Sequence, residues 1–234
     1  MTERNAYEPP TDTSAPAPPA RPGVLAYNPS HTLVLLLTLL LVAGLVLDVV
    51  SIGSDLLELE LLERMSSGDY TQDEAEGNDA RQVLLGLLHI LVYLPTVVVF
   101  AMFLRRASSN ARALGAHSMR FTPGWVVGWF FVPIANLFKP YQTVREIWEV
   151  SRPAQEIAML PALLPLWWAA WLASNLMGNV SFRLAMAGDD LPSLITSAQF
   201  NIATALVSVV CAVLALLLVR RLHAIQQQKS AELP

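Results

Sequence analysis

Four long apolar segments decide what this chain can fold into. They cover about residues 32–52, 83–104, 157–178 and 195–219 of the 234 residues. A helix needs about 20 mostly apolar residues to cross the hydrocarbon core of a bilayer, and each segment is long enough. Within lipid, a helix also satisfies all of its own backbone hydrogen bonds. We therefore predict an all-α integral membrane protein with four transmembrane helices.

Composition supports the same class of protein. The chain is 54% hydrophobic and only 15% charged, whereas soluble domains have about 25% charged residues. A formal net charge of −4 argues against a nucleic-acid partner. The bilayer itself is the first partner that we expect.

A further apolar stretch, residues 121–138, contains no charge but is repeatedly interrupted. The interrupting residues are Pro123, Gly124, Gly128, Pro133 and Asn136. Broken backbone at membrane depth is tolerated only where protein or a water-filled cavity shields its polar groups. The stretch therefore predicts a re-entrant or interfacial hairpin packed against neighbouring helices, with a full span as the alternative.

Residues 140–151 predict an amphipathic helix lying in the membrane plane, with Pro140 at its start. Its apolar face is expected to contain Tyr141, Val144, Ile147 and Trp148. A candidate docking face for a lipid headgroup or a partner protein comprises Gln142, Arg145, Glu146 and Trp148. The alternative is purely structural: the helix anchors the hairpin.

The same region carries a family resemblance. The residues that carry it include Trp125, Gly128, Trp129, Pro133, Asn136, Pro140 and Tyr141, followed by Arg145-Glu146-Ile147-Trp148. This pattern resembles the signature of a bacterial, mainly actinobacterial, membrane family known as domain of unknown function 4328. The resemblance implies a multi-pass membrane protein and no known activity. We expect the seven motif residues before Arg145 to be mainly structural.

Aromatic residues are concentrated around this motif. Trp167, Trp168 and Trp171 lie deep in the third apolar segment rather than at its ends, where tryptophan is usually found. We predict that they pack against Trp125, Trp129 and Phe130 in an aromatic core.

Asp48 and His89 are the ionisable residues within the apolar segments, where such groups are rare and often functional. The helical rise places them about 6 and 9 Å below the outer membrane edge, so we predict a polar pair. Other polar residues lie at a similar depth: Asn175, Asn179, Gln199 and Asn201. They indicate either a polar pocket open to the outside or ordinary hydrogen bonds between helices.

The basic residues orient the chain. With four spans and both termini cytoplasmic, twelve Lys and Arg residues lie inside and three outside, as the positive-inside rule requires of a cell-membrane protein. Residues 1–30 hold seven of the 16 prolines and predict a disordered cytoplasmic tail. Residues 31–222 form the membrane domain, residues 66–79 an acidic outer loop, and residues 223–234 a cytoplasmic tail.

Searches for chemistry find no phosphate-binding loop, nucleophile elbow or metal-binding motif. We therefore assign no catalytic residue, metal or cofactor. The leading hypothesis is a non-enzymatic scaffold or accessory subunit that presents residues 133–148 to a membrane or cytoplasmic protein partner. A small transporter or channel that uses the hairpin and the Asp48–His89 pair is the alternative, a lipid-modifying enzyme ranks third, and a homo-oligomer stays open.

Overall fold

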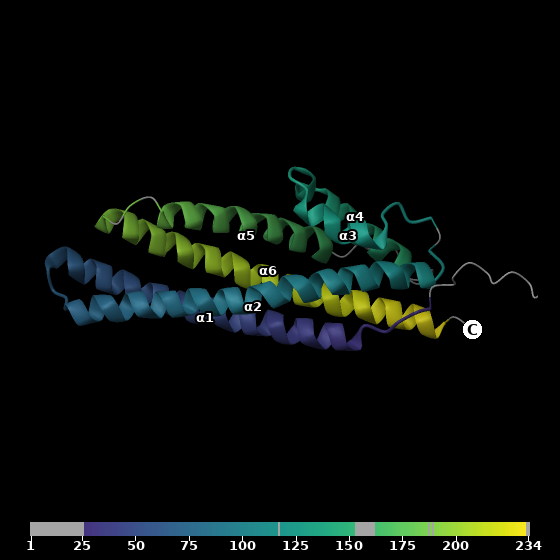
Figure 1. Ribbon diagram of the computed structural model, residues 1–234, viewed down its shortest axis with the longest axis horizontal. Helices are drawn as coiled ribbons and strands as arrows, with labels where there is room; N and C mark the ends of the chain where they lie inside the picture. The colour runs from purple at the N-terminus through teal and green to yellow at the C-terminus, as the bar shows by residue number, and fades with distance from the viewer. Residues whose placement is uncertain (1–25, 117, 153–161, 187, 189, 233–234) are drawn as a thin grey trace, which may run out of the picture.

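The computed structural model describes residues 26–116, 118–152, 162–186, 188 and 190–232, and this part of the chain is helical without strands. Four long helices run back and forth: α1 (His31–Ser67), α2 (Gln72–Ala113), α5 (Leu163–Ala185) and α6 (Leu191–Ala231). The start of α1 and the end of α6 lie at the same end of the molecule (Figure 1). The all-helical prediction is confirmed for the described residues.

Three of these helices, α1, α2 and α6, are long and apolar enough to cross a membrane. The fourth predicted span, α5, is not among them, and its apolar sequence is interrupted by three tryptophans, two asparagines and a proline. Its first predicted residues, 157–161, lie outside the described residues, and α5 begins at Leu163. Three candidate spans are therefore established, and the fourth stays a prediction.

The long helices form two hairpins, α1–α2 and α5–α6, which pack against each other mainly through α1 and α6. Helix α1 packs along α6, while α2 packs on α1 and α5 on α6. Helices α2 and α5 meet where Phe100 contacts Trp167. The hairpins diverge towards the end where α1 leads into α2 and α5 into α6 (Figure 1). We call this the turn end, and the opposite end, with residues 26–30 and 232, the terminal end.

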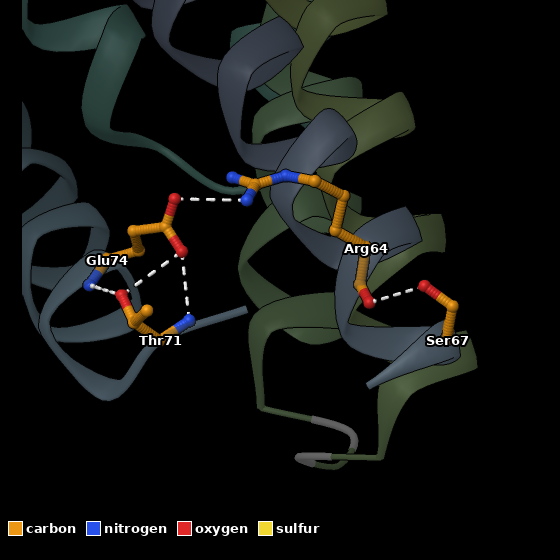
Figure 2. Close-up of polar contacts among 4 residues, drawn as sticks. All are labelled: Arg64, Ser67, Thr71 and Glu74. Carbon is orange, nitrogen blue, oxygen red and sulfur yellow. Dashed lines mark hydrogen bonds and ion pairs between the residues drawn. The ribbon is translucent and has the colours of Figure 1, made fainter. Parts of the chain in front are cut away.

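The turn between α1 and α2 is much shorter than the predicted loop at 66–79, so that prediction was wrong. Gly68 ends α1 in the left-handed conformation, and Thr71 and Glu74 form a capping box at the start of α2. Glu74 also pairs with Arg64 at 3.0 Å across the turn, and Ser67 Oγ donates to the Arg64 carbonyl (Figure 2). Such a box satisfies backbone donors at a helix start, and it places most of the acidic run on α2.

The interrupted stretch is broken into short pieces: α3 (Pro123–Gly128), η1 (Trp129–Phe131) and η2 (Ala135–Leu137), followed by α4 (Lys139–Ser151). Ile134, between η1 and η2, has a φ of 65°, which is unusual for a β-branched residue. The backbone is thus interrupted where the sequence predicts. Whether it enters a membrane as a hairpin stays a prediction.

A buried core fills the terminal end. It joins α2, α4, α5 and α6 through residues that include Phe103, Ile147, Leu164, Trp167 and Leu222. The buried Gln226 side chain donates to the Ala107 carbonyl at 2.8 Å and to Ser151 Oγ at 3.0 Å. Residues 223–231, predicted only as a tail, therefore continue α6 into this core.

Before α1, the backbone N–H of Asn28 donates to Asn110 Oδ1 at 3.1 Å, and Asn110 Nδ2 donates back to the Asn28 carbonyl at 2.9 Å. The last residues of the predicted tail are therefore tied to α2. Residues 1–25, on which most of the predicted disordered tail falls, lie outside the described residues.

Candidate functional site

A groove of about 540 Å³ runs between the two hairpins. Helices α2 and α5 form its walls, and α1 and α6 form its floor. The two walls meet through Phe100 and Trp167 at the terminal end, and the groove lies where they separate towards the turn end. Its volume is that of a typical small-molecule pocket, about 300–1,000 Å³. It is lined by residues that the sequence placed at a similar depth as a candidate polar pocket: Asp48, His89, Asn175 and Asn179.

Aromatic side chains close the groove on the side of the terminal end. Phe100 and Trp167 lie with ring centroids 6.0 Å apart, and Trp171 stacks on Trp168 at 4.7 Å. Phe130 from η1 contacts Phe100 at 6.4 Å and Trp171 at 5.7 Å, each ring edge to face. Such pairs add to the stabilisation that burial provides, so this end is a packed plug.

The predicted ring contacts with the tryptophans of α5 are confirmed for Phe130, while Trp129 packs against the buried core without such a ring contact. The rings of Trp125 and Trp129 lie 4.7 Å apart and contact each other. Within the described part of the chain, no ring contact joins either of them to the tryptophans of α5. The interrupted stretch thus sends one aromatic ring, not three, into the plug.

Asp48 and His89 meet in the groove. Asp48 Oδ1 lies 3.3 Å from His89 Nε2, and the two side chains are 15% and 36% exposed. His89 Nδ1 lies 3.0 Å from the carbonyl oxygen of Leu85 on its own helix. The two ring nitrogens are therefore both engaged, and both residues face the space between the hairpins.

The opposite wall supplies neutral polar groups. Asn175 Nδ2 donates to the Trp171 carbonyl at 2.7 Å, and Asn179 Nδ2 donates to the Asn175 carbonyl at 2.8 Å. Both residues line the groove, as do Ser174 and Ser208, whose hydroxyl oxygens lie 3.3 Å apart. Gln199 and Asn201, predicted at the same depth, are not among the lining residues. The polar end thus combines one carboxylate–imidazole pair with an asparagine wall.

The predicted docking face of α4 is mostly engaged within the molecule. Glu146 accepts from the backbone N–H groups of Arg120 at 2.6 Å and Phe121 at 3.3 Å. Arg145 pairs with Glu149 at 2.8 Å, and the Trp148 side chain is only 2% exposed. Trp148 therefore belongs to the core rather than to a surface, because α4 turns its apolar face onto α2 and α6. Gln142 and Arg145 stay exposed.

The motif residues hold the interrupted stretch in shape. A Cβ added at Gly128 would lie 3.1 Å from a ring carbon of Trp125, so the close approach of this tryptophan favours glycine. Pro140 stands in the first turn of α4, where a proline needs no hydrogen-bond partner. Tyr141 lies against Trp168 with ring centroids 6.4 Å apart.

Around the bend between Pro133 and Asn136, the Asn136 N–H donates to the Val132 carbonyl at 2.9 Å, while the Ala135 N–H donates to that of Pro133 at 2.7 Å. These bonds replace the helical ladder that the prolines interrupt. Nearby, the Lys139 ammonium lies 5.6 Å from the ring centroids of both Phe121 and Trp129, which joins the two ends of the stretch.

Sequence reasoning missed one further polar contact, at the terminal end. His223 Nε2 lies 3.3 Å from His31 Nδ1, and Gln227 Nε2 lies 3.2 Å from His31 Nε2. The three residues join the start of α1 to the end of α6. Nearly 200 residues separate the two histidines along the chain, so no local pattern could have found the pair.

These features define a class: an all-helical protein with three helices suited to crossing a membrane, a laterally placed groove and an interrupted aromatic segment beside it. Residues 67–224 match the family model described as domain of unknown function (DUF4328), and the chain belongs to this family. No curated protein and no solved structure matches the chain. The family description assigns no activity, so the groove has to carry the functional argument.

Proposed function

We propose that this chain is a non-enzymatic, multi-pass cell-membrane protein that holds an amphiphilic small molecule in the groove between α2 and α5. The single observation that carries the proposal is the groove of about 540 Å³, with an apolar, aromatic end and a polar end. A ligand with a hydrocarbon tail and a polar head matches this division. In this view the protein is an accessory or binding subunit, and residues 121–138 support the groove from the side of the terminal end.

Size argues against a transmembrane helix of a partner as the occupant. A helix with its side chains is about 10–12 Å wide, so a 15 Å length fills more than about 1,000 Å³. The groove has about half of that volume. A molecule of lipid-tail size fits better than a protein segment.

The proposal replaces the docking face of α4 as the leading site, for a physical reason. Two of its four residues, Glu146 and Trp148, are committed to the loop before α3 and to the core. A surface that consists of Gln142 and Arg145 is a small one for recognition, since interfaces generally bury many more residues.

A blocked groove tests this function. Gly178 lines the groove, and an added Cβ there would meet no atom within 4 Å. Gly178→Trp should therefore fill the groove without disturbing the helices, and binding of tritiated dodecanol to protein in phosphatidylcholine nanodiscs should fall by about tenfold or more, as loss of a buried tail implies. Gly86→Trp is the matched control, because Gly86 is exposed on α2 and is not among the residues that line the groove. Equal binding by both variants would refute the proposal.

A small transporter is the second candidate, favoured by the presence of Asp48 and His89 in the groove. In that case the aromatic plug would be the barrier that has to open. Uptake or efflux of a bound amphiphile by proteoliposomes, lost in Gly178→Trp but kept in Gly86→Trp, would distinguish transport from binding alone.

A further inference from the structure

We propose that the polar end of the groove is a cation-for-proton exchange site, where Asp48 binds the primary ammonium group of a single-chain amphiphile and the Asp48–His89 pair gives up a proton. This inference rests on the proposed function, because it names the class of ligand that the same groove takes. It follows from four observations on the groove.

The first observation is the proton count of the pair. The Leu85 carbonyl can only accept, so His89 Nδ1 at 3.0 Å must carry the hydrogen of that contact. The contact of 3.3 Å between Nε2 and Asp48 Oδ1 also needs a hydrogen, either on Nε2 or on the carboxyl group. In both cases the pair holds one proton more than a neutral imidazole with a carboxylate, and its total charge is zero.

The second observation is the supply of acceptors. The amide N–H groups of Asn175 and Asn179 are used by carbonyls of their own helix. Among the described residues, neither amide oxygen receives a hydrogen bond, and Asp48 Oδ2 receives none either. The polar end therefore offers oxygens that lack donors. A primary ammonium group carries three N–H donors and a positive charge, and so complements this set.

The third observation is the volume. A methylene group takes up about as much room as a water molecule in the liquid, roughly 30 Å³. A groove of about 540 Å³ is thus filled by one hydrocarbon chain with its head. The aromatic plug at Phe100, Trp167 and Trp171 gives the tail an apolar end, while Asp48 meets the head.

The fourth observation concerns the titratable and charged groups around the pair. The titratable groups that face it are Asp55 from α1, Tyr93 from α2 and Cys211 from α6. The wall formed by α5 contributes no ionisable residue to the groove. No fixed cation within the described lining competes with a ligand for Asp48.

The exchange is balanced in charge. The ammonium group enters, Asp48 becomes its carboxylate counter-ion, and His89 keeps the hydrogen on Nδ1 while Nε2 becomes a free acceptor. The displaced proton leaves to water. In the empty groove, the Asp48–His89 pair with its extra proton is neutral. In the occupied groove, the Asp48 carboxylate, the neutral imidazole and the ammonium group of the ligand also sum to zero. The net charge of the groove is therefore unchanged.

Calorimetric titration tests the exchange on full-length protein in phosphatidylcholine nanodiscs near pH 6. Dodecylamine should bind about tenfold more tightly than dodecanol, as a charge-assisted hydrogen bond implies. Repeating the titration in buffers of different ionisation enthalpy should show release of about one proton per amine. Dodecyltrimethylammonium, which has no N–H donor, should bind more weakly than the primary amine.

Two variants separate the binding of the ammonium group by Asp48 from the release of the proton. Asp48→Asn should lose the preference for the amine while it still binds dodecanol. His89→Gln should keep much of that preference but release no proton. Equal affinity of the wild-type protein for dodecylamine and dodecanol would overturn the exchange but leave the proposed function standing. If Gly178→Trp reduced the binding of neither ligand, the exchange and the proposed function would both be overturned. Amine binding without proton release would refute the exchange. Displacement of the amine by an ethanolamine phospholipid would refute the single-chain ligand.

Discussion

Ile134 has an unusual backbone conformation at the bend of the interrupted stretch. Its φ of 65° is one that β-branched residues rarely adopt, and the residue is 76% exposed. The conformation is imposed by the bend between η1 and η2, where the Leu137 N–H donates to the Ile134 carbonyl at 3.1 Å. The backbone of Ile134 is therefore strained, and the burial of this exposed residue does not offset the cost of that strain.

Ile134→Gly should stabilise the protein, by about 1 kcal/mol. Relief of a strained conformation returns about 1–3 kcal/mol, from which the greater entropy of glycine in the unfolded chain subtracts about 0.5–1 kcal/mol. Thermal unfolding in detergent, followed by circular dichroism, measures the change. Leu137→Gly is the matched control, because Leu137 is also an exposed apolar residue of this segment but has no positive φ, and it should destabilise. A lower midpoint for Ile134→Gly than for wild type would contradict this account.

At the scale of elements, the long helix pair α1–α2 continues past its apolar part towards the turn end. There Asp55 and Glu58 share the Gln82 amide, at 3.3 and 2.7 Å. Burial raises the pKa of both carboxyl groups, and the neighbouring Asp55 raises that of Glu58 further. Both lie beyond the predicted span at 32–52. The pKa of Glu74 in the turn is shifted the other way: hydrogen bonds from the Thr71 backbone and from Arg64 lower it.

The pH dependence follows from these signs. A group with a raised pKa in the folded state contributes stability that is complete below its unfolded value, about 4, and is lost as pH rises through the folded value. The double variant Asp55→Asn/Glu58→Gln should therefore gain stability relative to wild type at pH 7 and lose that advantage near pH 4. Thermal midpoints at both values measure it, with the exposed Glu60→Gln as control. An advantage that grows on acidification would show that the sign is wrong.

The sequence predicted the long helices because their apolar runs are continuous, and it predicted the break at 121–138 because prolines and glycines mark it. It missed the start of α2, although Thr71 and Glu74 have the spacing of a capping box, because the acidic run around them is also typical of a solvated loop. The matching depths of Asp48 and His89 predicted a pair, and the structure places them together. The use of Glu146 was not predictable, since its partners lie 25 and 26 residues earlier along the chain.

For the whole molecule, the decisive feature is the way in which two hairpins share one seam. Helices α1 and α6 pack along each other, while the outer helices α2 and α5 meet through Phe100 and Trp167 at the terminal end. The groove depends on this long-range arrangement, so the sequence indicated not its walls but only the shared depth of its polar residues Asp48, His89, Asn175 and Asn179. The basic residues gather towards the terminal end and its loops, which supports an orientation with that end in the cytoplasm.

Single cysteines test this orientation in a Cys211→Ala background. Asp73→Cys, exposed near the turn end, should react with an impermeant thiol reagent in intact cells. Gln228→Cys, exposed on α6 near the terminal end, should react only after the cells are permeabilised. Labelling of Gln228→Cys in intact cells would reverse the assignment.

The separation of α2 from α5 has a consequence for how occupancy is set. With α5 as the predicted fourth span, the groove opens between two lipid-facing helices and exchanges molecules with the surrounding leaflet rather than with water. The quantity that governs its filling is then the mole fraction of the ligand among the lipids, and the volume of the aqueous phase matters only through partitioning. The same protein would read the make-up of its own membrane, and a change in that make-up would reach the site by two-dimensional diffusion.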